Sequence, residues 1–151
     1  MSIYNTPLEE RFGEKLEELR EGKNMTREQL AEQVGLTARH IAALERGERR
    51  PTLNTMEKLL RTQFPDLASK YVRQFALLFL DLQKKCDSAE ISTKALDLRG
   101  MLDALRLIRR GIPAGAALDM GITNKAFDSY EQGLIRDVIA ARIPAKLDAA
   151  K

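Results

Sequence analysis

Residues 25–51 read MTREQLAEQVGLTARHIAALERGERRP, and this stretch decides how the first part of the chain folds. Thr26 is followed three residues later by Gln29, which is the spacing of a capping box at the start of a helix. Gly35 is suited to end that helix, and Thr37 is suited to cap the next one. The pattern therefore predicts two short helices joined by a tight turn that contains glycine.

Further helices are predicted on either side of this unit. Phe12, Leu16 and Leu19 recur at four- and three-residue spacing, which predicts a helix over about 8–21. Pro51 cannot continue a helix, so a loop precedes a fourth helix that begins at about residue 53. The residues predicted to face the core from the second, third and fourth helices are Leu30, Ala31, Val34, Ile41, Leu44, Met56, Leu59 and Leu60.

The second half of the chain also has a helical pattern. Four helices are predicted there, over about 67–85, 94–109, 114–120 and 125–141. Ser92 or Thr93 is suited to cap the second of them. Because no segment has the alternation of a strand, the fold class predicted is all-α, with one domain over 1–62 and a second small helical bundle over 63–151.

Composition narrows the class of protein. The 151 residues are 44% hydrophobic and 31% charged, which is typical of a soluble globular protein. Apolar runs stay well short of the roughly 18 residues that a membrane span needs, and residues 1–10 show no secretory signal. A single cysteine, Cys86, excludes an intramolecular disulfide and a cysteine-rich zinc site. We therefore expect a cytoplasmic protein.

Residues 25–51 resemble the helix-turn-helix of the Cro and phage-repressor family, also called the xenobiotic-response-element (XRE) family. The positions that carry the resemblance are Leu30, Ala31, Gly35, Ile41, Leu44, Glu45, Arg46, Gly47 and Pro51. The resemblance implies a lambda-repressor-like domain that binds double-stranded DNA, and a transcriptional regulator such as a repressor. A homodimer is expected, because two-fold symmetry doubles the contacts on a palindromic site.

A helix-turn-helix that places its third helix in the major groove predicts which residues contact DNA. Base contacts are predicted for the outer side chains near the start of the third helix, and for one family-matched arginine of the second: Arg27, Thr37, Ala38, Arg39, His40 and Ala43. Arg39 has the donors to read a guanine edge. Contacts to the DNA backbone are predicted for Thr26, Arg46, Arg49 and Arg50. The alternative is that Arg39, His40, Arg49 and Arg50 are simply solvated.

Two charged residues have a different expected role. The family resemblance implies that Arg20 and Glu45 pair across the domain. They are therefore expected to be structural rather than to read DNA. The same resemblance allows the pair to orient an arginine that contacts phosphate.

The second half resembles the C-terminal helical lid of MoxR-type AAA ATPases. The resemblance rests on 64–67 (FPDL), 91–100 (ISTKALDLRG) and 120–128 (MGITNKAFD). A lid arginine of that family senses nucleotide phosphate, and here Lys94 stands nearest to its position, with Arg99 further on. The chain has no Gly-x-x-x-x-Gly-Lys-Ser/Thr phosphate loop, so ATP hydrolysis is not expected.

No other enzyme chemistry is apparent. The single histidine and single cysteine fall in different halves. Asp97, Asp103, Asp119 and Asp128 lack metal spacing and are interpreted as caps and solvated residues. We expect no cofactor and no metal. Cys86, next to Lys84 and Lys85, is either a reactive thiolate or, more simply, a structural residue.

Two roles remain open for the second half. The apolar cluster at 77–80 is either core or a dimer face. The leading hypothesis is a DNA-binding regulator whose second half serves dimerisation, docking or sensing. The rival is an adaptor protein whose lid-like half engages an AAA-type ATPase or another protein.

Overall fold

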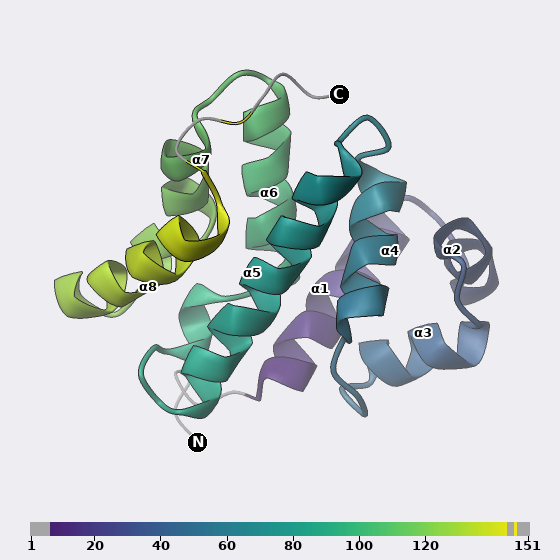
Figure 1. The fold of residues 1–151 in the computed structure, drawn as a ribbon. Helices are drawn as coiled ribbons and strands as arrows, with labels where there is room; N and C mark the ends of the chain where they lie inside the picture. Colours follow the sequence, from purple (N-terminus) through teal and green to yellow (C-terminus); the bar gives the residue numbers. More distant parts are fainter. Residues whose placement is uncertain (1–6, 145–146, 148–151) are drawn as a thin grey trace.

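The chain is all-helical, as the sequence predicts. The computed structural model describes residues 7–144 and 147 (Figure 1), and within that part of the chain it contains eight α-helices and no strand. The helices are α1 (Leu8–Gly22), α2 (Arg27–Val34), α3 (Ala38–Glu45), α4 (Leu53–Gln63), α5 (Ser69–Asp87), α6 (Leu98–Arg109), α7 (Ala114–Gly121) and α8 (Ser129–Arg142). Two short 3₁₀ helices, η2 (Thr93–Ala95) and η3 (Thr123–Lys125), precede α6 and α8. Of the helices described, none is long and apolar enough to cross a membrane.

The capping residues predicted for the first region are confirmed. The Thr26 hydroxyl accepts from the Gln29 amide at 3.0 Å, and the Gln29 side chain accepts from the Thr26 amide at 2.8 Å. Thr37 caps α3 by accepting from the His40 amide at 3.0 Å. Gly35 ends α2 with φ +83°, a left-handed conformation that glycine adopts without steric cost. The sequence thus fixes both ends of the turn between α2 and α3.

The helix starts predicted in the second half are wrong at two places. The helix expected from residue 94 begins instead at Leu98, because Leu96 is extended and the Asp97 carboxylate caps α6 by accepting from the Gly100 amide at 2.7 Å. The helix expected from residue 125 begins at Ser129, where Asp128 is the cap. In both places a 3₁₀ turn occupies the start of the predicted helix, and an aspartate further along supplies the better cap.

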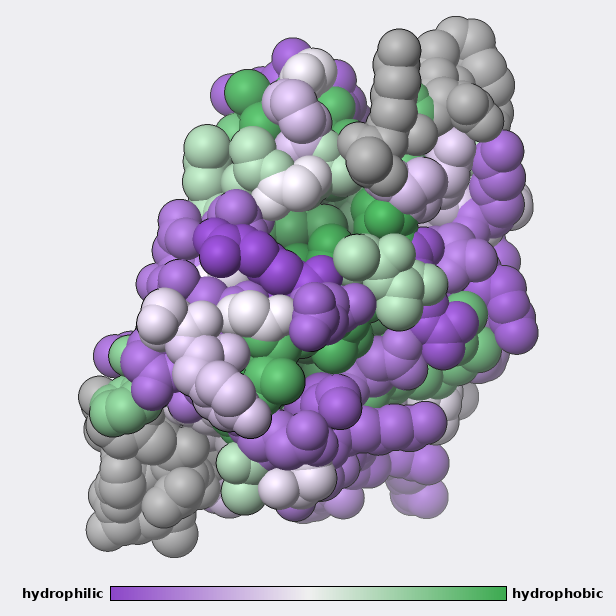
Figure 2. All heavy atoms as spheres, turned by 60° about the vertical axis from the view of Figure 1, so that its left-hand side comes forward, coloured by the Kyte–Doolittle hydropathy of each residue, from purple (hydrophilic) through white to green (hydrophobic). Residues whose placement is uncertain are grey.

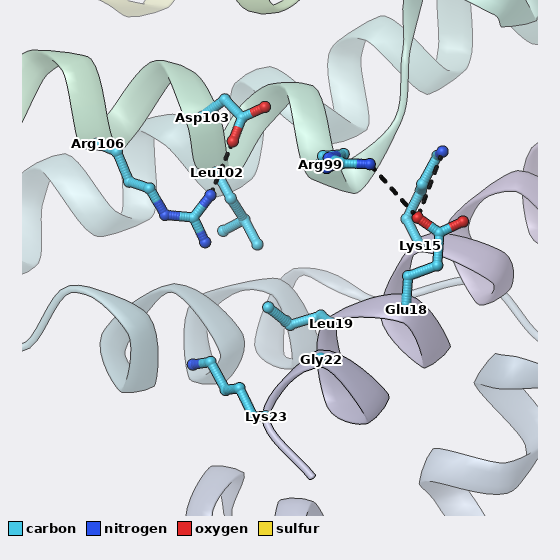
Figure 3. A pocket seen from close by; sticks show the side chains of 9 residues that line it. All are labelled: Lys15, Glu18, Leu19, Gly22, Lys23, Arg99, Leu102, Asp103 and Arg106. Atoms are coloured by element: carbon cyan, nitrogen blue, oxygen red, sulfur yellow. Dashed lines mark hydrogen bonds and ion pairs between the residues drawn. The ribbon is translucent and has the colours of Figure 1, made fainter. Parts of the chain in front are cut away.

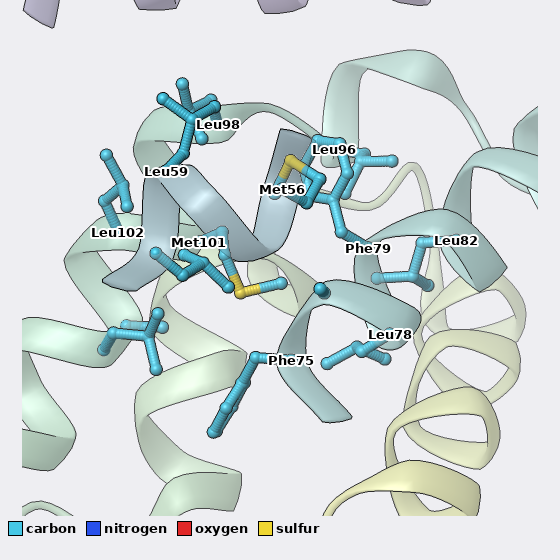
Figure 4. Close-up of a cluster of buried hydrophobic side chains, with 14 of the residues drawn as sticks. Met56, Leu59, Phe75, Leu78, Phe79, Leu82, Leu96, Leu98, Met101 and Leu102 are labelled. Atoms are coloured by element: carbon cyan, nitrogen blue, oxygen red, sulfur yellow. The ribbon is translucent and has the colours of Figure 1, made fainter. Parts of the chain in front are cut away.

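One hydrophobic core spans both halves of the chain. Helix α4 packs against α5, and α1 packs against α6. The Phe12 and Phe79 rings meet edge to face with centroids 6.0 Å apart. Figure 4 shows Met56 and Leu59 of α4 close to side chains of α5 and α6. The second helical region is therefore packed directly on the first.

Charged side chains also connect the two halves. Arg11 of α1 donates to the Asp97 carboxylate at 3.3 Å. Lys125 donates to the same carboxylate at 3.2 Å, so the cap of α6 is joined to α1 and to η3. Arg50, in the loop after α3, donates to both Asp87 oxygens at 2.8 Å.

Two helix contacts depend on glycine. A Cβ atom at Gly100 would lie 2.2 Å from the Gly121 carbonyl oxygen, so α6 and α7 meet backbone to backbone. A Cβ atom at Gly13 would lie 2.4 Å from the Leu44 carbonyl oxygen, where α1 crosses the end of α3.

Candidate nucleic-acid interface

Helix α3 has one buried face and one outward face. Ile41, Leu44 and Glu45 are buried against the rest of the domain. Arg39 and Thr37 are exposed, and Ala38, His40 and Ala43 are partly exposed. The five residues predicted for base contact from this segment therefore lie together on the accessible side near the start of α3.

A buried carboxylate holds the first three helices together. The Glu45 side chain is 1% exposed and accepts from Arg20 Nε at 2.6 Å and Arg20 Nη2 at 3.1 Å. Arg27 Nε donates to the same carboxylate at 2.9 Å. Arg20 also donates to the Met25 carbonyl oxygen at 2.9 Å, before α2 begins. Since these residues come from α1, α2 and α3, the network fixes how α3 is presented.

The charge on Glu45 depends on its two arginines. Burial alone would raise the pKa of Glu45, but hydrogen bonds from Arg20 and Arg27 outweigh burial and leave that pKa below its usual value. The pKa of Arg20 is raised, chiefly by its hydrogen bond to Glu45. Both partners stay ionised at neutral pH.

Arg27 lies at the first position of α2 with its guanidinium against Glu45. The side chain is about one third exposed, so part of the guanidinium is open to solvent. Contact with DNA would use the donors that Glu45 leaves free. The hydroxyl of Thr26, next to it, is already engaged as the helix cap.

The loop after α3 contains arginines in two different environments. Arg46 and Arg49 are exposed, and among the described residues neither has an ion-pair partner. Arg50 instead donates to Glu9 at 2.6 Å and to Asp87 at 2.8 Å. The pKa of Arg50 is raised, first by the hydrogen bond to Asp87. Contact of Arg50 with phosphate would compete with these two carboxylates.

His40 is uncharged at neutral pH. Desolvation lowers its pKa, and the nearby charges of Arg49 and Lys58 lower it further. A neutral imidazole offers one donor and one acceptor, which suits a polar contact better than charge neutralisation.

Lys58 was missed by the sequence analysis. Its ammonium donates to the Gly35 carbonyl oxygen at 3.0 Å, from α4 across to the turn between α2 and α3. This bond ties α4 to the turn. A lysine on a helix surface gives no sequence pattern from which this contact could be predicted.

The described residues contain no metal-binding cluster. Over residues 7–144 and 147, no cluster of three or more histidine, cysteine or acidic side chains is arranged to hold a metal. Asp97 and Asp128 cap helices, while Asp103 and Asp119 pair with arginines. Cys86 is buried, and burial raises the pKa of its thiol to about 12.

Comparison with known proteins supports the helix-turn-helix assignment of the first region. Residues 16–62 match a protein-family model described as helix-turn-helix, so the chain contains an N-terminal helix-turn-helix domain. A domain of this kind indicates a DNA-binding regulator of the XRE type. No curated protein and no solved structure gives a significant match to the chain.

Proposed function

We propose that this protein is a sequence-specific transcriptional regulator that binds double-stranded DNA as a homodimer. The observation that carries the proposal is the cationic outer side of α3 and its following loop. Arg39, Arg46 and Arg49 are exposed there, and within the described part of the chain no carboxylate pairs with them. Arginines in this state are available to phosphates and guanine edges without breaking an internal ion pair.

The roles proposed for the outer residues follow from their positions. Arg39 reads a guanine edge, Ala38 and Ala43 contact thymine methyl groups, and Thr37 and His40 make polar contacts. Arg46 and Arg49 contact phosphates and fix the register on DNA. Arg20 and Glu45 hold the domain together, and Arg27 contributes only the donors that Glu45 leaves free. Thr26 and Arg50 remain weaker candidates for the backbone, since each already has an internal partner.

Fluorescence anisotropy on duplexes from upstream of the gene, across a salt series, tests this proposal. Binding should exceed that of a scrambled duplex and weaken as salt rises, because phosphate contacts release counterions. Arg39→Ala should lose about 1–3 kcal/mol of binding free energy on the specific duplex. Arg110→Ala, an exposed arginine of the second region, is the matched control and should change little. If neither these duplexes nor genome-selected DNA bind above background, the regulator proposal is wrong.

The rival function rests on the exposed side chains of the second region. Met120, Phe127 and Tyr130 are 57%, 65% and 73% exposed. Figure 2 shows apolar side chains among charged ones on the side that carries α7 and α8. Large exposed apolar residues of this kind favour contact with a protein. An adaptor whose lid-like half engages another protein is therefore the second candidate.

Sedimentation of the free protein separates the two uses of this surface. If a second copy covers it, the protein sediments as a dimer, and Phe127→Ser with Tyr130→Ser yields monomers. If the unaltered protein is monomeric at high concentration, the dimer proposal fails and a different partner of the second half is favoured.

A further inference from the structure

A groove lies between α1 and α6, where the helix-turn-helix region meets the second region. Its volume is about 310 Å³, within the range of about 300–1,000 Å³ that is common for small-molecule sites. Figure 3 shows Leu19 and Lys23 of the α1 side facing Leu102 and Arg106 of α6 across this space. The groove therefore bridges the two regions, away from the outward face of α3.

The charges that line the groove do not balance. Four cationic side chains face two carboxylates, and the cations are Lys15, Lys23, Arg99 and Arg106. Glu18 is shared, lying 3.6 Å from Arg99 and 3.7 Å from Lys15.

The two remaining cations, Arg106 and Lys23, have different partners. Asp103 pairs with Arg106 at 2.8 Å. Lys23 donates to the neutral amide oxygen of Gln63 at 2.9 Å. An anion that enters the groove would thus meet a surplus of positive charge.

The groove also has an apolar part. Leu102 is buried and Leu19 is half-buried, and both contribute to the lining. Gly22 leaves space at the end of α1, because a Cβ atom built there meets nothing within 4 Å. A ligand that fits must combine a negative group with an apolar body.

We infer that this groove binds a small organic anion, such as an aryl or alkyl carboxylate, phosphate or sulfonate. The anionic group pairs with the cations of α6 and of the end of α1, and the apolar body contacts Leu19 and Leu102. Bound in this way, the ligand connects α1 to α6 and strengthens the contact between the two regions. The inference concerns small-molecule binding and stands independently of DNA binding.

The binding test uses two dyes that differ by one charge. 8-Anilinonaphthalene-1-sulfonate carries an aromatic body with a sulfonate, and N-phenyl-1-naphthylamine has the same body without the charge. The full chain is titrated with each dye, and fluorescence gives the Kd. The sulfonate should bind saturably at one site, at least about tenfold more tightly than the neutral dye, because only the sulfonate forms charge-assisted hydrogen bonds.

Two pairs of variants locate the site. Gly22→Leu fills the groove, whereas Gly115→Leu adds the same side chain at another glycine with open space around it, on α7. Arg99→Gln removes a lining cation, whereas Arg110→Gln removes an exposed cation outside the groove. Both groove variants should raise the Kd for the sulfonate by about threefold or more, the scale of one exposed charge contact, and both controls should leave it within about twofold. Thermal melts verify that each variant is folded.

Three results would overturn the inference. The first is the absence of saturable binding of the sulfonate dye. The second is equal affinity for the neutral dye. The third is affinity that is unchanged by both groove variants but lost in Phe127→Ser with Tyr130→Ser, which would assign the dye to the exposed aromatic surface instead.

Discussion

The regions α1–α4 and α5–α8 are both helical and share one core, yet they use charge in opposite ways. In the first region a carboxylate, Glu45, is buried beneath two arginines, while Arg39, Arg46 and Arg49 stay open to solvent. In the second region, most exposed arginines lie beside carboxylates, and the helices meet through apolar side chains and glycine.

This difference separates the functions that each region can serve. Equal numbers of basic and acidic residues occur in residues 1–62, so net charge does not mark that region as cationic. Burying an acidic group among arginines and leaving other arginines unpaired produces a positive face on a neutral domain. In the second region most exposed arginines have a carboxylate partner, and Met120, Phe127 and Tyr130 are exposed large hydrophobic side chains.

The reaction rate of the Cys86 thiol measures how well the second region excludes reagents from its core, and this is the largest effect expected. The pKa of about 12, raised from an ordinary 9.0, keeps the buried thiol protonated at mildly alkaline pH. Its reaction with 5,5′-dithiobis(2-nitrobenzoate) should be roughly a thousandfold slower in the folded protein than in guanidinium chloride. Equal rates in the two conditions would mean that α5 opens readily.

Glu45→Gln tests the charged interior of the first region. The change leaves Arg20 and Arg27 without their carboxylate and should lower the free energy of unfolding by about 3 kcal/mol in urea melts. Glu48→Gln, on the exposed loop nearby, is the control and should change stability by less than about 0.5 kcal/mol.

The stability difference between wild type and Glu45→Gln should also depend on pH. Because the pKa of Glu45 is lowered in the folded state from its ordinary value of 4.5, its contribution to stability is present above that ordinary value and is lost as pH falls through the folded value. The stability difference between wild type and Glu45→Gln should therefore shrink in acid. A difference that stays constant down to strongly acidic pH would contradict this ion-pair role.

Gly100→Ala tests the glycine contact of the second region. The added methyl group meets the Gly121 carbonyl oxygen, so α6 and α7 must separate, at a cost of about 2 kcal/mol in thermal or urea melts. Gly115→Ala adds the same group where space is open and should be neutral or stabilising. Equal stability of the two variants would show that α6 and α7 move apart easily.

Substitution of the two adjacent arginines in the loop after α3 should have different effects on DNA binding and stability. These effects are the smallest expected. Arg49→Ala should weaken DNA binding by about 1 kcal/mol and lower the salt slope by about one, because an unpaired arginine is lost. Arg50→Ala should change DNA binding less and stability more, because Arg50 joins the loop to Glu9 and Asp87. Anisotropy in a salt series together with urea melts measures both. If both variants lose the same DNA affinity, Arg50 also contacts a phosphate.

Several features of the first region could be predicted from the sequence because they are local. Thr26, Gln29, Gly35 and Thr37 act on amides within a few residues of themselves, so their spacing is enough to predict the turn. The apolar periodicity predicts which faces of α1–α4 are buried for the same reason. The position of Asp97 as the cap of α6 was harder to predict, since Ser92 and Thr93 also fit a cap.

Other features were decided only by the tertiary structure. Arg49 and Arg50 are neighbours of the same type, yet only Arg50 has Glu9 and Asp87 within reach. These carboxylates come from distant parts of the chain, so no local pattern distinguishes the two arginines.

The sequence by itself determined that the chain is helical and where the helix-turn-helix lies, because both depend on interactions between near neighbours. The tertiary structure decided which arginines are open to solvent, where glycine lets α6 meet α7, and where the groove between α1 and α6 forms. Each of these depends on distances between residues far apart in the sequence, and such distances are set only when the helices pack on one core.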